Sequence, residues 1–244
     1  SSCDEPAAAV VADGTRVMSN VIATQHHLHE QYAGVVPEIA SRAHLERITP
    51  VIREALRDAK IGYSDLQAVA VGHRPGLIGS LLVGVSAAKA LAWSLEIPII
   101  GVDHIDAHLH AGLLEAPPVE YPALGLVVSG GHTTLFLIES PIQTQRLGKT
   151  IDDAVGEAYD KAATILGLGY PGGPKLDALA QTGDDRAHDL PVTLLGHDSL
   201  DFSFSGLKTA LLYAVCGQPA GRAAIGLAHA TPVSFVRSAG VRTR

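Results

Sequence analysis

The order strand, helix, strand in the first half of the chain constrains the fold most. Residues 66–72 and 98–102 are short, apolar and rich in β-branched side chains, as buried strands are. Residues 77–95 between them have the length of a helix and consist mainly of small and apolar side chains. A helix that connects two strands in this way predicts an α/β fold in which the helix is buried.

The start of the chain adds a hairpin and a long helix to this fold. Residues 7–12 and 16–24 predict two strands around an Asp13-Gly14 turn, which is a strong hairpin signal. A helix is expected to begin at Pro37, because apolar residues then recur at helical spacing. Pro50 lacks the backbone donor that a helix interior needs, so we expect a kink or a break there.

Charge and cysteine content exclude several classes of protein. The net charge of −7 provides no overall basic surface, so contact with a nucleic acid needs a local patch or a partner. Cys3 and Cys216 lie far apart without C-x-x-C spacing, which excludes a disulfide framework and a thiolate zinc site and fits a reducing cytoplasm. No secretory segment opens the chain, and its most apolar stretch contains Lys89, so we expect a buried helix and no membrane span.

One local basic patch lies on the helix that begins at Pro37. Its arginines alternate with Glu46 and Glu54, a pattern typical of a solvated, salt-bridged surface but also compatible with an RNA contact. These arginines are Arg42, Arg47, Arg53 and Arg57.

Two histidines follow the strand at residues 98–102, at the point where a helix should begin. His104 and His108 share one helix face at a spacing of i and i+4, so both imidazoles can reach one metal ion. Twelve histidines in 244 residues also produce such pairs by chance. The zinc-peptidase motif needs Glu after its first His, and this chain has Ile105 there. We expect Asp103 to cap the helix, while Asp106 either holds a histidine ring or caps as well.

A second candidate site lies in the predicted hairpin of residues 125–138. A Gly-Gly turn brings Ser129, His132 and Thr133 to its tip, where backbone N–H groups can form a nest for an anion and hydroxyls can add donors. An ordinary hairpin turn explains the same pattern. The glycine-rich loop at residues 74–80 lacks the Gly-Lys-Ser/Thr ending of a P-loop, so we expect its glycines to permit close helix packing.

A third feature is the acidic start of a helix expected from Asp152. Asp153, Glu157 and Asp160 would share one face, which suits ribose hydroxyls or an ammonium group. A solvated face paired through Glu157 and Lys161 is the alternative. A tight turn is expected at residues 170–174, and a last helix from near residue 201 to about 215.

Taken together, motifs from residue 1 to about 215 resemble the TsaD family, the bacterial tRNA threonylcarbamoyladenosine transferases once described as glycoprotease-like. The motifs are Ser2-Cys-Asp-Glu5, Gly34-Val-Val-Pro-Glu38 with Ser41, Arg42 and His44, Pro75-Gly-Leu77, His104-x-x-Ala-His108, Val128-Ser-Gly-Gly-His-Thr133, Asp152-Asp153, Tyr170-Pro-Gly-Gly-Pro174 and Asp201-Phe-Ser-Phe-Ser-Gly-Leu-Lys-Thr209.

The resemblance implies an actin-like, Hsp70-like ATPase fold of two α/β lobes. It implies transfer of a threonylcarbamoyl group from threonylcarbamoyl-adenylate to N6 of the adenosine next to the tRNA anticodon, with TsaB-like and TsaE-like partners in the cytoplasm. It also implies one divalent metal ion, iron or zinc, with His104 and His108 as two of its ligands. Asp4 or Glu5 would orient or deprotonate the amine. The substrate-binding residues implied are Val127, Val128, Ser129, Gly130, Gly131, Asp160, Gly173 and Asp177.

The chain departs from the family pattern after residue 215. A Gly-Gly-x-x-x-Asn segment and a later Asp, the third metal ligand, are absent, and residues 216–244 have the character of out-of-frame translation. We therefore expect lobes at residues 1–106 and 107–215, a truncated second lobe, a missing natural start and little transfer activity. The alternatives are a non-catalytic fragment that retains partner binding, an ATP phosphotransferase of the same fold, and a metallopeptidase.

Overall fold

A computed structural model describes residues 1–32, 34–112, 114, 119–184, 190–192, 195–196 and 198–217. By its internal contacts the chain divides into two units, Ser1–Pro118 and Val119–Arg244. The division expected at residue 106 falls within helix α4 (His104–Ala111), whereas the contacts place all of α4 in the first unit. Most of the tail expected at residues 216–244 lies outside the described residues.

The first unit opens with the predicted hairpin. Strands β1 (Ala7–Ala12) and β2 (Arg16–Ile22) pair in antiparallel fashion. Asp13 and Gly14 have φ values of 55° and 78°, as a tight turn between twisted strands requires. A register shift between Val10 and Val11 marks a bulge in β1. The sequence located this turn correctly because few residues other than Asp, Asn and Gly adopt positive φ.

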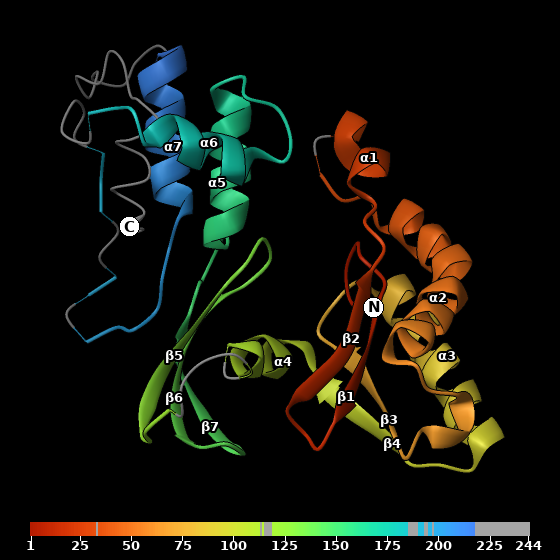
Figure 1. Cartoon of the computed structure of the whole chain (residues 1–244). Coiled ribbons are helices and arrows are strands. Elements are labelled where there is room, and N and C mark those ends of the chain that lie inside the picture. Colours follow the sequence, from red (N-terminus) through yellow and green to blue (C-terminus); the bar gives the residue numbers. More distant parts are fainter. Residues whose placement is uncertain are drawn as a thin grey trace. The chain divides into compact units, whose positions relative to one another are not determined.

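The strand, helix, strand unit is also confirmed. Strands β3 (Val69–Arg74) and β4 (Ile99–Asp103) are parallel neighbours, and helix α3 (Ile78–Leu95) connects them. Helix α2 (Pro37–Ala59) packs on β1 and β2 and lies beside α3 (Figure 1). The topology of the first unit is therefore that of an α/β fold.

Helix α2 runs without interruption through Pro50 and buries one apolar face. Pro37 occupies its first turn, where a missing N–H costs nothing. The helix ends at Lys60, whose φ of 58° places it in the left-handed region. Pro50 therefore does not divide the helix, since the packing of residues on both sides of it outweighs one lost hydrogen bond. The buried apolar residues of α2 are Ala40, Ala43, Ile48, Val51, Ala55, Leu56 and Ala59.

Helix α3 is less buried than its composition predicts. It buries Leu81, Ala88 and Ala92, but Ile78 and Trp93 are 77% and 86% exposed. Within the described ranges it is the one helix long and apolar enough to cross a membrane, by length and composition. The expectation of a buried helix was therefore wrong. An apolar composition does not reveal how many faces of a helix pack against other elements.

Short helices complete the first unit. Helix α1 (His26–His29) continues into the 3-10 turn η1 (Glu30–Tyr32), and a second 3-10 turn, η2 (Tyr63–Asp65), precedes β3. Helix α4 follows β4 directly. The end of a parallel strand thus becomes the first turn of a helix, and the two candidate histidines lie there.

The second unit combines an antiparallel sheet with three helices. Strands β5 (Ala123–Val128), β6 (Thr133–Ser140) and β7 (Gln143–Lys149) pair in the order β5-β6-β7. Helix α5 (Val155–Ile165) packs against α6 (Gly172–Ala180) and α7 (Ser205–Cys216), as Figure 1 shows. Their shared core includes side chains with at most 1% exposure: Ala158, Ala162, Ala163, Leu176, Leu207 and Leu211.

Two elements of this unit were not predicted from the sequence. Strand β7 carries Gln143, Gln145 and Arg146, whose polarity hides the strand pattern. Helix α6 begins within the stretch of residues 170–174 that predicted a tight turn. A bend at Tyr170 and Pro171 leads at once into this helix.

Candidate functional site

The two histidines occupy one face of α4. Asp103, the last residue of β4, caps this helix, because its Oδ1 accepts a hydrogen bond from Ile105 N at 2.9 Å, and Arg74 Nε lies 3.4 Å from its Oδ2. The predicted cap is confirmed. Helical geometry from His104 onward then brings the Nε2 atoms of His104 and His108 to 3.1 Å, with ring centroids 4.3 Å apart.

This separation fits a shared metal ion. Two imidazole nitrogens bound to one ion at about 2.0–2.1 Å, with an angle between roughly 90° and 110°, lie about 2.8–3.4 Å apart. The observed 3.1 Å lies within this range. His108 is exposed and His104 is half-buried, so an ion can reach the pair from solvent. No group of three or more His, Cys, Asp or Glu suited to a metal occurs in the described ranges, which leaves a two-histidine half-site.

One contact of His104 was not anticipated from the sequence. Ser2 Oγ lies 3.2 Å from His104 Nδ1, across 102 residues of chain. The motif Ser2-Cys-Asp-Glu5 predicts roles for its two carboxylates, because these groups are ionisable. A hydroxyl that contacts the ring of a distant histidine gives no such signal in a sequence.

Asp4 and Glu5 are half-buried in the same unit. Burial, followed by the nearby Asp4 carboxylate, raises the pKa of the Cys3 thiol to about 11. Burial lowers the pKa of His44, and a hydrogen bond to Ala40 O and the charge of Asp4 act in the opposite direction. Asp4 therefore lies near Cys3 and His44. Neither carboxylate joins the histidine pair in a metal-binding cluster within the described part of the chain.

The hairpin tip of the second unit differs from an anion nest. Neither Gly130 nor Gly131 has a positive φ, which the alternating backbone of a nest requires. Ser129 closes the turn instead: its N–H donates to His132 O at 2.8 Å, and its Oγ accepts from His132 N at 3.1 Å. The prediction of a nest is therefore wrong in this form, and an ordinary turn is present. Both glycines are exposed, and a Cβ at either position would meet nothing within 4 Å.

The hydroxyl of Thr133 is also engaged within the fold. Thr133 is 2% exposed, and its Oγ1 accepts a hydrogen bond from Val155 N at 2.9 Å. It thus satisfies an N–H in the first turn of α5. Gly156, in the same turn, donates to Ser129 O at 3.3 Å, and a Cβ there would lie 2.6 Å from that oxygen. The hairpin tip and the start of α5 therefore form one packed feature.

The remaining candidate substrate residues lie together on α5 and α6. Asp160 Oδ1 accepts hydrogen bonds from Gly172 N at 2.8 Å and Gly173 N at 3.0 Å, which binds the start of α6 to α5. A Cβ on Gly172 would lie 2.4 Å from Ala163 Cβ, so this contact requires glycine. Asp177 follows on α6, close enough to Tyr159 that its charge, after burial, helps raise the pKa of that phenol to about 12.

The acidic face expected on α5 is largely neutralised. Helix α5 begins at Val155, so Asp153 precedes it, and its carboxylate pairs with Lys161 and Lys208 at 2.9 Å each. Burial alone would raise the pKa of Asp153, but hydrogen bonds from the two lysines lower it. Lys161 also contacts Glu157 at 2.8 Å. The alternative of a paired face is confirmed for these residues.

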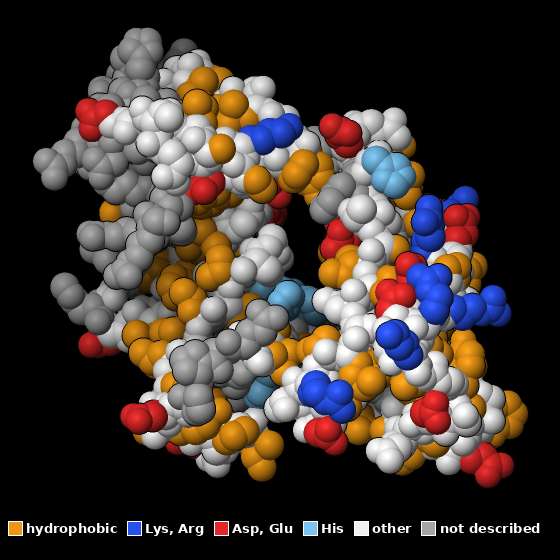
Figure 2. Space-filling view, viewed as in Figure 1, with side chains coloured by type: hydrophobic (Ala, Val, Ile, Leu, Met, Phe, Trp, Pro, Cys, Tyr) orange, Lys and Arg blue, Asp and Glu red, His pale blue; other side chains and the backbone are white. Residues whose placement is uncertain are grey.

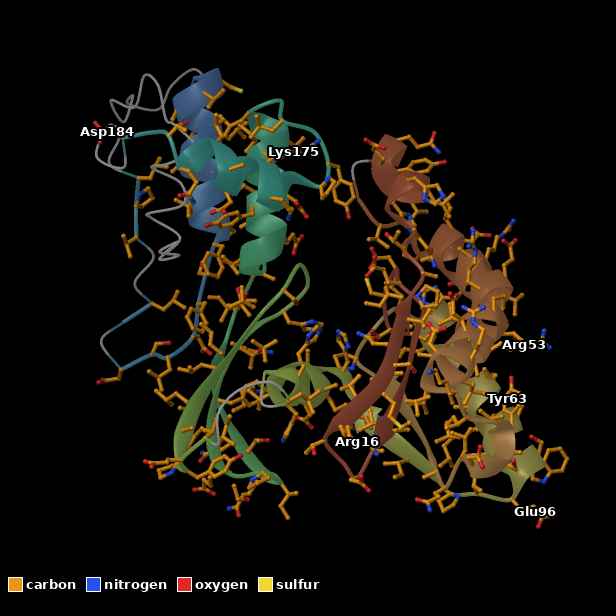
Figure 3. The ribbon with its side chains drawn as sticks, in the orientation of Figure 1. Arg16, Arg53, Tyr63, Glu96, Lys175 and Asp184 are labelled. Carbon is orange, nitrogen blue, oxygen red and sulfur yellow. The ribbon has the colours of Figure 1, made fainter. Side chains whose placement is uncertain are left out.

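The arginines of α2 form an exposed row. Figure 2 shows Lys and Arg side chains gathered over α2, and Figure 3 shows Arg53 pointing away from the helix. Arg42 pairs with Glu38 at 2.8 Å and Arg57 with Glu54 at 3.0 Å, as on a solvated surface. Arg47 and Arg53 form no ion pair with the residues that the structure describes. The row therefore retains two cationic groups without an ion pair among the described residues.

Comparison with known sequences identifies the family. The model of the TsaD family, described as tRNA N6-adenosine threonylcarbamoyltransferase, matches residues 16–237. The chain belongs to the TsaD family. The match includes most of the segment from residue 216 that we expected to depart from the family, so the nature of that segment stays a prediction.

Curated relatives agree with this membership. Proteins named tRNA N6-adenosine threonylcarbamoyltransferase from Trichlorobacter lovleyi and Moorella thermoacetica are 57% and 56% identical to this TsaD chain, over 89% and 87% of its length. The chain covers 64% and 62% of these two proteins, or less than two thirds of each.

A solved structure supports the fold class. Component A of the (R)-2-hydroxyglutaryl-CoA dehydratase of Acidaminococcus fermentans is similar to this TsaD chain with a TM-score of 0.51 at 11% identity, covering 97% of this chain and 71% of that one. At this identity the likeness concerns the fold alone. The fold is mixed α/β of the actin-like ATPase type.

Proposed function

We propose that this TsaD chain carries the metal-binding part of a tRNA threonylcarbamoyltransferase. In the reaction, N6 of the adenosine next to the anticodon attacks the carbamoyl carbon of threonylcarbamoyl-adenylate. The new N–C bond forms, the bond from carbon to the phosphate oxygen breaks, AMP leaves with that electron pair, and N6 loses a proton. The observation that carries the proposal is the pair of Nε2 atoms 3.1 Å apart in a member of this family.

His104 and His108 would hold one divalent ion, iron or zinc. When bound, such an ion supplies Lewis-acid polarisation of the carbonyl. Asp4 or Glu5 would orient the attacking amine or accept its proton, because a carboxylate near the reacting nitrogen suits either task. Two protein ligands leave further coordination positions open for a substrate oxygen or for water.

The acyl-adenylate would be held by the second unit. Gly130 and Gly131 present exposed backbone at the hairpin tip with open space around them, beside Val127, Val128 and Ser129. Each glycine has one backbone N–H, and these donors would bind an acyl or phosphate oxygen without forming a nest. Asp160 uses one carboxylate oxygen to hold Gly172 and Gly173. Its other oxygen and Asp177 would accept hydrogen bonds from hydroxyl groups, and Gly173 would allow close approach of the backbone.

We also propose that TsaB-like and TsaE-like proteins act with the chain in the cytoplasm. Helices α2 and α3 approach closely where a Cβ on Gly79 would lie 2.0 Å from Ser41 Oγ. Leu45, Ile78 and Leu82 flank this crossing and are 70%, 77% and 59% exposed. Such apolar side chains favour a protein partner at this surface. Leu82→Asp should abolish co-purification with a TsaB-like protein, whereas Leu124→Asp in the other unit should not.

A transfer assay with a matched chimera tests the activity. Residues 1–215 would be joined to the remaining C-terminal part of the Trichlorobacter lovleyi relative and supplied with threonylcarbamoyl-adenylate, tRNA and partner proteins. We expect transfer from the chimera and loss of transfer in its His104→Ala variant. Equal transfer with and without His104 would contradict the proposed role of the metal.

A further inference from the structure

The polypeptide segment that carries Ser2 is fixed by its backbone. Leu77 N donates to Ser2 O at 2.8 Å, and Ser80 Oγ donates to Cys3 O at 2.7 Å. Gly76 permits this approach, since a Cβ there would lie 2.2 Å from Ser2 O, and its φ of 156° disfavours other residues. The Ser2 side chain is thus held at the start of α3 by contacts that do not involve its hydroxyl.

From this position the hydroxyl reaches a ring nitrogen of a candidate metal ligand. Ser2 Oγ lies 3.2 Å from His104 Nδ1, and the opposite ring nitrogen, Nε2, faces His108. The Asp103 cap fixes the backbone at the start of α4. The ring of His104 is therefore held at its Cβ and at its Nδ1. Its Nε2 stays directed toward His108 Nε2, where a shared ion would bind.

The position of one proton follows from this arrangement. A histidine that binds a metal through Nε2 must carry its proton on Nδ1, and that N–H needs an acceptor. The Ser2 hydroxyl oxygen is placed to be this acceptor. Without a metal, His104 Nε2 would then accept a hydrogen bond from His108 Nε2–H across the 3.1 Å between them. Metal binding would move only the proton of His108.

We propose that Ser2 is a positioning residue of the histidine half-site: its hydroxyl accepts the Nδ1 proton of His104 and keeps the Nε2 lone pair available for the metal. This inference rests on the proposed metal-binding function. Loss of the hydroxyl favours the tautomer with the proton on Nε2, so this proton must be displaced before the ion binds. Outer partners of this kind typically change metal affinity by about 10- to 100-fold.

The first test measures affinity for Zn²⁺ by competition with a chromogenic chelator, using the whole chain. Ser2→Ala should weaken binding about 10- to 100-fold, and Ser2→Thr, which retains a hydroxyl, should bind like the wild type. Ser1→Ala is the matched control, because Ser1 Oγ donates to Ser80 O at 2.9 Å in the same segment. Unchanged affinity in Ser2→Ala, or equal weakening in Ser1→Ala, would overturn the inference.

The second test needs no metal and separates this inference from the proposed function. Nitrogen-15 NMR of the metal-free chain, above the histidine pKa, reports which ring nitrogen carries the proton. We expect Nδ1–H for His104 and Nε2–H for His108, with His104 changing to Nε2–H in Ser2→Ala. A wild-type His104 protonated on Nε2 overturns the role of Ser2. A Ser2-dependent Nδ1–H in a chain that binds no Zn²⁺ supports that role and refutes the metal site.

Discussion

Asp152 anchors helix α7 to the start of α5, and its removal should destabilise the second unit. Its Oδ1 accepts hydrogen bonds from Phe204 N at 2.8 Å and Ser205 N at 3.3 Å, and its Oδ2 accepts one from Ser205 Oγ at 2.7 Å. Ser203 Oγ also donates to this carboxylate. One side chain thus satisfies N–H groups at the start of a helix that lies more than 50 residues away.

The expected loss of unfolding free energy in Asp152→Ala follows from the number of these hydrogen bonds and their exposure to water. Loss of a capping side chain costs about 0.5–2 kcal/mol, and a hydrogen bond to a charged group contributes about 1.5–3 kcal/mol when water is excluded. Asp152 is exposed, so water replaces part of what Asp152→Ala removes. We therefore expect a loss of about 1–2 kcal/mol in unfolding free energy at neutral pH. Asp152→Asn retains one acceptor oxygen and should lose less.

Urea unfolding followed by circular dichroism measures this change, and pH supplies a second readout. Burial alone would raise the pKa of Asp152, but hydrogen bonds from Ser203, Phe204 and Ser205 lower it. The stabilisation is therefore present above the ordinary Asp pKa of about 3.9 and is lost as pH falls through the lower native value. Wild type and Asp152→Ala should converge in acid. Equal urea midpoints at pH 7 would refute the reasoning.

Three further changes test other parts of the structure. Gly172→Ala should destabilise the second unit, because its Cβ would lie 2.4 Å from Ala163 Cβ, and an unchanged melting temperature would contradict this. The pKa of buried His44 is lowered, so the native state resists its protonation: stability should be complete above about pH 6.5 and decline as pH falls below it, and His44→Gln should flatten this slope in thermal melts. The Cys3 thiol, with its pKa raised to about 11, should react slowly with iodoacetamide at pH 8, and Asp4→Asn should accelerate the reaction.

Local sequence signals predicted the elements whose cause is local. The Asp13-Gly14 turn needs positive φ, the Asp103 cap needs a short acidic side chain before a helix, and both appear where the sequence placed them. The i, i+4 spacing of His104 and His108 likewise became a short distance once α4 formed. Each feature depends on a few consecutive residues.

Features that depend on partners far apart in the sequence were not predicted. Thr133 resembled a ligand-binding hydroxyl but caps α5, 22 residues further along the chain. Asp153 resembled part of an open acidic face, yet Lys208 from α7 neutralises it. The contact between Ser2 and His104 depends on how α3 holds the start of the chain. In each case a side chain with an evident chemical role meets a partner that only the tertiary fold brings near.

The most direct test of the central claim is a metal titration of the purified chain and of its His104→Ala and His108→Ala variants. Co²⁺ binding followed by visible absorption reports both the number of ions and the presence of nitrogen ligands. We expect one ion per wild-type chain and loss of that binding in each variant. Retention of the same ion with the same spectrum in either variant would contradict this prediction.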